Sequence, residues 1–246
     1  MGLASKYEDI IHQELKLHAA WLPVTDPFKL GDYGQISNGV FEKLGNIFTD
    51  FGVSFTDEPG KDISFNFISE KTVVVDSGAN AGVNITPQAE IKANVTYKFQ
   101  KDESFLINAP IINVSIINNV NQVAIKLKET DGWKRKFIVV SKVYTAKKAL
   151  IIGANEGGTE VTISAEGNGL EQFNVGEASV KFSLKTNKKL GLEIKGETGV
   201  IALGLFKLRL IGGGPTFLGD EVEGGEDESD ENPFEDLDGQ KLSEVN

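Results

Sequence analysis

The side chains best suited to chemistry are two histidines, His12 and His18, because the chain contains no cysteine and no other histidine. An imidazole could act as a general base or bind a metal ion. The apolar spacing of residues 3–21 predicts a helix, and residues six apart in a helix lie on different faces. We therefore expect no metal pair from these histidines and assign no metal site.

Other motifs that would carry catalysis are missing from the sequence. The lack of cysteine excludes disulfides and thiolate nucleophiles. The glycine-rich stretches "GANEGG" and "IGGGP" are not followed by Lys and Ser or Thr, so they indicate turns and not phosphate-binding loops. The acidic stretch "DESDENPFEDLDG" lacks the spacing of a calcium loop. We predict no catalytic residue, no cofactor and no enzymatic activity.

Charge is distributed unevenly along the chain. The net charge of −11 resides in the segment from Asp220 onward, which holds twelve acidic residues against Lys241 alone. A like-charged block with few apolar residues cannot offset its ordering entropy by burial. We expect a β-rich body, residues 1–218, and an acidic tail, residues 219–246, that is mobile or inhibitory. The balanced body, with "WKRKF" as a single small basic cluster, predicts no nucleic-acid partner.

The sequence also indicates a compartment. It has no run of about 18 apolar residues, and its start, "MGLASKYEDII", lacks the apolar core of a signal peptide. A myristoylation motif would place Ser or Thr at position 6, where this chain has Lys6. We expect a cytoplasmic protein that is soluble in its resting state.

The elements that would position any site are mainly strands. After the helix, the segment from Leu30 to Gly60 contains five spaced glycines before its final residue and predicts brief strands, tight turns or a short helix. The run 72–76 indicates a buried strand, and the run 137–140 indicates a strand buried on both faces. Alternation of Val123, Ile125 and Leu127 predicts a further strand.

Two amphipathic hairpins carry the clearest pattern. Residues 89–99 alternate apolar and polar side chains without a break, and after the polar tip "QKDES" the alternation resumes over residues 112–116. Residues 178–186 alternate in the same way, and a return strand follows the tip "TNKK" over residues 190–194. A last apolar run, "VIALGLFKLRLI", ends at three glycines. These patterns predict a β-rich antiparallel chain.

An ordinary sheet with one face on a core explains such hairpins, but three features add a membrane interpretation. The outbound strands match the roughly 9–11 residues that a tilted membrane strand needs. Their polar faces carry lysines that would suit water on either side of a bilayer. Both tips are polar. Because the edges of an isolated hairpin would be unsatisfied in lipid, spanning would require many copies joined into a closed oligomer.

The layout resembles the gasdermin family, and in particular the compact bacterial gasdermins, over roughly residues 20–215. The resemblance lies in the order of "LPVTDPFKLGDYG", "FEKLGNI", the first amphipathic strand pair, "RKFIVVSKVYTAKKALIIGANEGG", the second hairpin and "GVIALGLFKLRLI". It implies an α+β, β-rich fold in which a twisted antiparallel sheet with two long amphipathic hairpins is flanked by short helices.

The resemblance also implies a function. Gasdermins are stored as soluble monomers, released when a protease removes an inhibitory C-terminal segment, and assembled into membrane pores that kill the cell, typically as antiviral (antiphage) defence. The expected partners are therefore membrane lipid, an activating protease and further copies of this chain, with the active form in the inner (plasma) membrane.

Two departures from the family pattern are visible. Compact bacterial gasdermins tend to carry an N-terminal cysteine for lipid attachment, and this chain has none. Its C-terminal segment is mostly acidic. The apolar groups there that could dock are Phe217, Leu218, Phe234, Leu237 and Leu242. We hypothesise that the tail neutralises basic hairpin tips and repels anionic lipid until it is cut.

Candidate site residues follow from the hairpins. Membrane-inserting side chains, expected to face a core at rest and lipid when active, are Ile91, Val95, Tyr97, Phe99, Val180, Phe182, Leu184, Leu192 and Ile194. Headgroup or tip contacts are assigned to Lys98, Lys101, Lys188 and Lys189. The candidate cleavage region includes Asp220, Glu221, Glu223, Glu226 and Asp227. Two alternatives remain open: a soluble β-sheet binding or structural module with a solubilising tail, and a small-molecule carrier.

Overall fold

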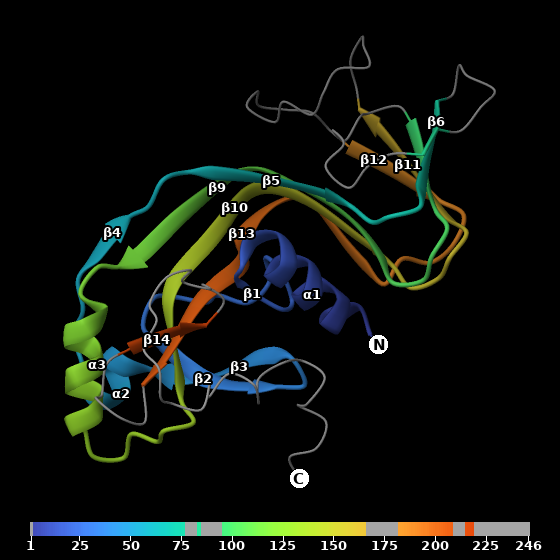
Figure 1. Cartoon of the computed structure of the whole chain (residues 1–246). Coiled ribbons are helices and arrows are strands. Elements are labelled where there is room, and N and C mark those ends of the chain that lie inside the picture. Colours follow the sequence, from blue (N-terminus) through green and yellow to red (C-terminus); the bar gives the residue numbers. More distant parts are fainter. Residues whose placement is uncertain (1, 77–82, 85–94, 166–181, 209–214, 219–246) are drawn as a thin grey trace, which may run out of the picture. The chain divides into compact units, whose positions relative to one another are not determined.

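The computed structural model describes residues 2–76, 83–84, 95–165, 182–208 and 215–218, which form three helices and fourteen strands (Figure 1). The helices are α1 (Leu3–Leu15), α2 (Ile47–Phe51) and α3 (Val120–Glu129). The strands are β1 (His18–Ala19), β2 (Asp32–Ser37), β3 (Val40–Asn46), β4 (Asp57–Pro59), β5 (Ile63–Ile68), β6 (Thr72–Asp76), β7 (Val83–Asn84), β8 (Val95–Phe99), β9 (Ser104–Ile117), β10 (Ile138–Ala154), β11 (Thr159–Ala165), β12 (Phe182–Thr186), β13 (Leu192–Leu208) and β14 (Pro215–Leu218). The predicted α+β, β-rich, antiparallel class is confirmed.

The chain divides into two compact units. Unit 1 comprises Met1–Lys6, Gly60–Val114 and Tyr144–Val200, and unit 2 comprises Tyr7–Pro59, Ser115–Val143 and Ile201–Asn246. A five-stranded sheet with the order β12-β11-β8-β6-β7 belongs to unit 1. A nine-stranded sheet follows the order β1-β13-β10-β2-β3, with β14 on β13 and with β9 joining β4, β5 and β10.

The predicted pairing of the two hairpins is wrong. In the described residues β8 pairs with β6 and β11, while β9, the strand after the first tip, belongs to the other sheet. In the same way β12 pairs with β11, whereas β13 pairs with β1, β10 and β14. Alternation identifies strands but not their partners, which are chosen by the core that the strands share. Both outbound strands therefore flank β11.

The core of unit 1 is built from alternating strand residues and the core of unit 2 from aromatic and helical ones. The first consists of the buried residues Ile68, Val95, Tyr97, Phe99, Leu106, Leu150, Ile152, Ala154, Val161 and Ile163. The second consists of Tyr33, Ile47, Val53, Ile117, Val120, Val123, Ala124, Leu127, Phe137, Val139 and Phe206. Residues 137–140 are buried, as predicted.

The predicted strand over Val123–Leu127 is the helix α3. Val120, Val123, Ala124 and Leu127 are all buried and repeat at helical spacing, whereas Ile125, the middle residue of the expected alternation, is 55 % exposed. A three-residue alternation fits both periods, and the additional apolar residues decide for the helix. The run 72–76 is a strand, β6, as predicted, but Val75 is 36 % exposed, so the strand is only partly buried.

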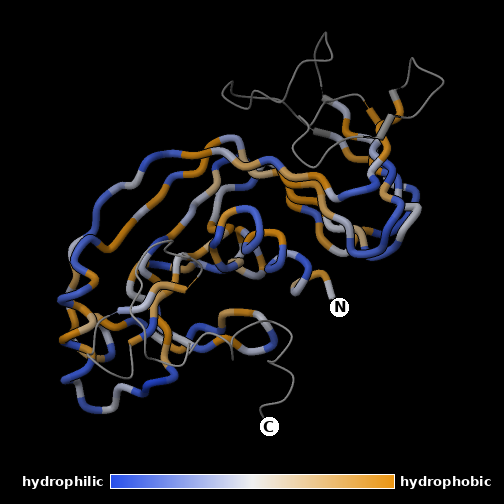
Figure 2. The backbone as a smooth tube through the Cα atoms, in the orientation of Figure 1, coloured by the Kyte–Doolittle hydropathy of each residue, from blue (hydrophilic) through white to orange (hydrophobic). Residues whose placement is uncertain are grey.

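The first helix is shorter than predicted. It ends at Leu15, where Lys16 adopts a left-handed backbone with φ of 55° and donates its N–H to the His12 carbonyl at 3.0 Å. The chain then turns into β1, where His18 lies opposite Leu203 of β13. In Figure 2 this helix carries both hydrophobic and hydrophilic residues. Tyr7, Ile10 and Ile11 form its buried side, as the spacing predicts.

The segment from Leu30 to Gly60 forms the brief strands and short helix that its glycines indicate. β2 and β3 pair from Ser37↔Val40 to Asp32↔Asn46, and α2 follows at once. Asn46 caps α2, because its Oδ1 accepts the N–H of Phe48 at 3.0 Å. Among the described residues, no helix combines the length and the hydropathy needed to cross a membrane.

Candidate functional site

The five-stranded sheet of unit 1 contains most of the described candidate residues, and its strands give it two unlike faces. In β8, Val95, Tyr97 and Phe99 are at most 3 % exposed. The register places Tyr97 opposite Val161 and Val95 opposite Ile163, so β11 continues the same face. We call this the apolar sheet face. It packs on Ile68, Leu106, Leu150 and Ile152 in the unit 1 core.

The opposite face of the same strands is polar and carries paired side chains. Thr96 and Thr162 lie directly opposite each other, with their hydroxyl oxygens 2.7 Å apart. Lys98 and Glu160, also opposite each other, form an ion pair with 2.8 Å between Nζ and Oε1. Both side chains of the ion pair are partly exposed. We call this the polar sheet face; the exposed Lys185 of β12, opposite Thr162, also belongs to it.

β12 extends both faces on the far side of β11. Leu184 lies opposite Ile163, is half-buried and packs on the unit 1 core. Its neighbour Ser183 is exposed on the other face, opposite Ser164. In the described residues β12 pairs with β11 alone, so its other side is an edge of the sheet. Figure 1 labels β12, β11 and β6 of this sheet, and β8 lies between β11 and β6.

β11, which lies between β12 and β8 in this sheet, contains none of the candidate residues. β11 supplies Val161 and Ile163 to the apolar sheet face, both completely buried. Its sequence, "TEVTISA", alternates in the same way as the hairpin strands, so the signal was present. In the sequence, β11 does not border either predicted hairpin tip, so the hairpin pattern alone does not mark it as part of the site.

The remaining predicted membrane-facing residues have different surroundings. Ile194 is buried and Leu192 half-buried, but both belong to β13 of the nine-stranded sheet. Phe182 begins β12, where its backbone lies opposite Ala165. Ile91 and Val180 lie outside the described residues.

The lysines assigned to the tips are mostly paired with carboxylates of the body. Nζ of Lys101 lies 3.4 Å from Glu70 Oε2. Nζ of Lys188 lies 3.2 Å from Glu156 Oε2 and donates to the Gly157 carbonyl at 2.8 Å. Lys189 is exposed. Exposed pairs of this kind are weak and easily exchanged.

The loops at this end of the sheet are tied to one another by backbone contacts. Asp102 accepts the N–H of Gly157 at 2.6 Å, which joins the first tip to the turn between β10 and β11. Asn187, just after β12, accepts the N–H of Glu160 at 2.7 Å and donates to the Gly158 carbonyl at 3.1 Å. The polar tips therefore form a single loop cluster in unit 1.

The candidate cleavage residues, Asp220 to Asp227, lie outside the described residues. The chain before them forms β14, an element that the sequence did not predict, with Phe217 opposite Phe206 of β13. Leu218 is buried, and the rings of Phe206 and Phe217 are 6.3 Å apart. Burial lowers the pKa of Lys207, which lies opposite Thr216.

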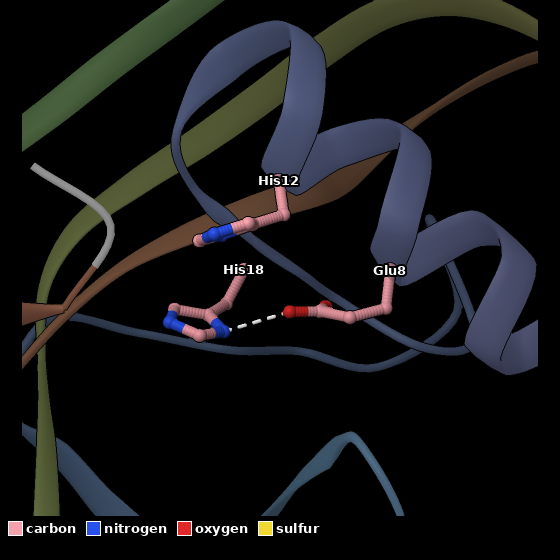
Figure 3. A group of neighbouring side chains, drawn as sticks. All are labelled: Glu8, His12 and His18. Carbon is pink, nitrogen blue, oxygen red and sulfur yellow. Dashed lines mark hydrogen bonds and ion pairs between the residues drawn. The ribbon is translucent and has the colours of Figure 1, made fainter. Parts of the chain in front are cut away.

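A second cluster involves the two histidines. The prediction that both lie on one helix, on different faces, is wrong. Because α1 ends at Leu15 and the chain returns as β1, His18 lies beside His12, with ring centroids 5.8 Å apart (Figure 3). His18 Nδ1 is 2.8 Å from Glu8 Oε1. The expectation of different helix faces failed because His18 is not in the helix.

Burial is the main cause of the raised pKa of two tyrosines in unit 2, Tyr7 and Tyr33. Tyr7 is fully buried and donates its hydroxyl to the Ile201 carbonyl at 3.2 Å. Burial raises the pKa of Tyr7 well above its usual value, with a smaller contribution from the charge of Glu8. The pKa of Tyr33 is also raised, first by burial and then by Asp50.

Comparison with known proteins finds similar solved structures. No protein-family model and no curated protein matches the sequence. The structure of a bacterial gasdermin from Bradyrhizobium tropiciagri matches 80% of this chain and 84% of its own length, with 12% sequence identity and a TM-score of 0.34. The cryo-EM structure of the Gasdermin A3 membrane pore matches 91% of this chain and 96% of its own, with 10% identity and a TM-score of 0.30. Both of these structures are gasdermins.

Proposed function

We propose that this chain is a non-enzymatic, gasdermin-like pore-forming protein that inserts strands of its five-stranded sheet into a membrane as an oligomer. The observation that carries the proposal is the two-faced sheet itself. Val95, Tyr97, Phe99, Val161 and Ile163 form a buried apolar strip on one face, with Thr72 and Thr159 beside Phe99 at its end. The other face bears hydroxyls and the Lys98–Glu160 pair. A membrane strand needs this division, with one face to lipid and one to water.

The resting and active states would differ in what covers the apolar sheet face. At rest it contacts the unit 1 core. In the membrane, lipid would replace that core at little net cost, because hydrophobic burial is not directional. The backbone groups along the β12 edge would still need partners in lipid. A neighbouring copy would supply them, which makes assembly part of insertion.

The acidic tail is proposed as the restraint. Three of the four tip lysines already have body carboxylates within 4.0 Å, so the tail is not needed to neutralise them. Its charge would instead oppose approach to an anionic membrane surface. A protease cutting after Leu218 would remove this charge and leave β14 attached. The resting protein would be cytoplasmic and the active one in the inner membrane, serving cell death in antiviral defence.

Dye release from anionic liposomes tests this proposal. A protease site is inserted between residues 219 and 225, and intact and cut proteins are compared. We expect release after cutting only, and ring-shaped oligomers on the liposomes. A cut body that stays folded and monomeric and releases no dye would reject pore formation. A full-length variant whose tail acids are changed to Asn and Gln should release dye before it is cut. If that variant releases dye only after cutting, as the wild type is expected to do, the electrostatic mechanism alone is rejected.

A matched pair of variants on β12 tests which face meets lipid. Leu184→Asp places a charge on the apolar sheet face at a half-buried position, and Ser183→Asp places the same charge one residue away on the polar face. A charge on the lipid side of a membrane strand costs about 2–4 kcal/mol at the bilayer midplane for Arg or Lys, and less for Asp. We expect Leu184→Asp to reduce release strongly and Ser183→Asp to leave it nearly unchanged, with both intact proteins folded. Equal release would contradict the assigned orientation.

One observation favours a second function, a soluble binding or structural module. The apolar sheet face is covered by the protein's own core, as in any antiparallel sheet with one buried face. This alternative requires that removal of the tail changes nothing at a membrane. The liposome experiment separates the two functions directly.

A further inference from the structure

The side chains of Glu8, His12 and His18 form a cluster in unit 2 that the proposed pore formation does not use (Figure 3). One possible ligand atom of each lies within 4.8 Å of those of the other two. Glu8 and His12 are four residues apart on α1 and therefore share a helix face. β1 brings His18 beside them from the following segment.

The contact with Glu8 decides which nitrogen of His18 is available to a ligand. His18 Nδ1 lies 2.8 Å from Glu8 Oε1. An ionised carboxylate can only accept a hydrogen bond, so in the neutral imidazole that faces it Nδ1 carries the proton and Nε2 carries the lone pair. The second carboxylate oxygen accepts the backbone N–H of Ala19. Glu8 is thereby fixed at both oxygens and holds the His18 ring in one orientation.

Nε2 of His18 is buried and has no hydrogen-bond partner among the described residues. Buried polar atoms without a partner are rare, and they call for an explanation such as a water or an ion. The neighbouring ring is His12, whose plane is tilted by 43° to that of His18. His12 is exposed, so solvent and dissolved ions reach this pair of imidazoles.

We propose that this cluster binds one divalent transition-metal ion, such as Zn²⁺ or Cu²⁺, through Nε2 of His18 and a ring nitrogen of His12. Imidazole nitrogen suits both ions. Glu8 is the positioning residue, in the carboxylate–histidine–metal arrangement that orients many metal ligands. Nitrogen ligands lie about 2.0–2.1 Å from Zn²⁺, so His12 turns toward His18 on binding, and water fills the remaining positions.

Binding at this site would link α1 to the nine-stranded sheet. His18 pairs with Leu203 of β13 through the backbone, whereas His12 belongs to the helix. A ligand that binds the folded form alone stabilises it by mass action. Zn²⁺ should therefore raise the unfolding temperature of the full-length protein, and the rise should require His12.

Calorimetric titration of the full-length protein with Zn²⁺ tests the site. Excess Mg²⁺ is kept present because the carboxylates of the acidic segment prefer such hard ions. We expect one Zn²⁺ per chain, with affinity about 10–100-fold lower in Glu8→Gln and lower still in His12→Gln and His18→Gln. Glu14→Gln, an exposed carboxylate on the same helix, is the matched control and should bind like the wild type.

His12→Gln is the decisive variant because an exposed helix residue can be replaced without unfolding the chain. The second readout is the electron paramagnetic resonance spectrum of bound Cu²⁺. Since the chain has two histidines and no cysteine, coupling to imidazole nitrogen can come only from this cluster. Equal Zn²⁺ affinity in the wild type and His12→Gln, or a Cu²⁺ spectrum showing oxygen ligands alone, would overturn the proposal.

Discussion

The five-stranded sheet of unit 1 and the β2–β3 region of unit 2 are stabilised in different ways. In the sheet the same kind of contact repeats at every second residue along β8 and β11. In the β2–β3 region the strand pairing is joined to a network of individual polar contacts. The carboxylate of Asp32, 1 % exposed, accepts the N–H of Lys29 at 2.8 Å and the side-chain amide of Asn46 at 2.9 Å, and it pairs with Lys43 Nζ at 2.8 Å.

The difference indicates which region can change its surroundings. A repeating apolar face can be covered by a core, another copy or lipid, because burial of apolar surface has no preferred direction. A buried polar network is favourable only when every member finds its partner. We therefore expect the unit 1 sheet to depend on apolar volume and sidedness, and the β2–β3 region to depend on individual atoms.

The largest expected effect is that of Phe99→Ala in the unit 1 sheet. Phe99 is completely buried, and truncating a buried Phe to Ala costs about 3–5 kcal/mol of unfolding free energy. Phe99→Leu keeps most of the apolar volume and should cost roughly 1–2 kcal/mol. Urea unfolding of both variants gives the comparison.

Phe48→Ala is the control for this pair, because Phe48 is 59 % exposed and its loss should change the free energy of unfolding by less than about 0.5 kcal/mol. If Phe99→Leu proved as damaging as Phe99→Ala, the sheet would depend on exact shape. The contrast between the two regions would then be lost.

The next largest effect is expected for Gly34→Ala in β2. A Cβ at this position would collide with the backbone carbonyl of Glu42 in the paired strand, which has no flexible end that could move aside. We expect a loss of about 3 kcal/mol in unfolding free energy, within the range for overpacking. Gly39→Ala, in the turn between the same strands, meets no atom but has φ of 75° and should cost about 1 kcal/mol. Similar losses would place the constraint in backbone conformation and not in strand contact.

A smaller effect is expected for Tyr7→Phe. The variant loses the hydrogen bond to the Ile201 carbonyl, which still accepts from the N–H of Ala20 at 3.2 Å, so the cost at neutral pH is about 1 kcal/mol. Burial raises the folded pKa of Tyr7 above the unfolded value of about 10. The contribution of Tyr7 to the stability of the wild type is therefore fully present below pH about 10 and is lost as the pH rises further.

In Tyr7→Phe that alkaline loss should be smaller, because one of the tyrosines that ionise only on unfolding is gone. Both tryptophans, Trp21 and Trp133, belong to unit 2, and Trp21 lies 5.9 Å from Tyr7. Their fluorescence during urea unfolding at several alkaline pH values gives the measurement. If the unfolding free energy of Tyr7→Phe fell with rising pH as steeply as that of the wild type, Tyr7 would not be the cause of the alkaline loss.

The strands of unit 1 could be predicted from the sequence, but their partners could not. Alternation marks which residues of β8 and β12 share a face, because a strand repeats every two residues. It does not distinguish a return strand from β11, which lies between them in the sheet. In α3 a three-residue alternation was mistaken for a strand, and the helical repeat of Val120 and Ala124 with Val123 and Leu127 would have corrected it.

The histidine cluster shows a different limit. The apolar pattern of α1 continues past Leu15 in the sequence, and the left-handed turn at Lys16 has no glycine to mark it. The contact of His18 with Glu8 depends on the pairing of β1 with β13, nearly two hundred residues away. No local pattern could indicate that pairing, so the predicted separation of the two histidines followed from one misplaced helix end.

The smallest expected effect is the exchange of Lys98 and Glu160 on the polar sheet face. Lys98→Glu alone places like charges opposite each other and should cost about 0.5 kcal/mol, because both groups are partly exposed. Adding Glu160→Lys should restore the stability, since only the sign of the pair matters there. The same exchange at Asp32 and Lys43 should fail, because Asp32 also accepts from Lys29 and Asn46. Urea unfolding of both exchanged proteins measures this difference. If the unfolding free energy recovered at both sites, the β2–β3 network would be no more specific than the sheet. If it recovered at neither site, the polar face of the sheet would be as specific as the network.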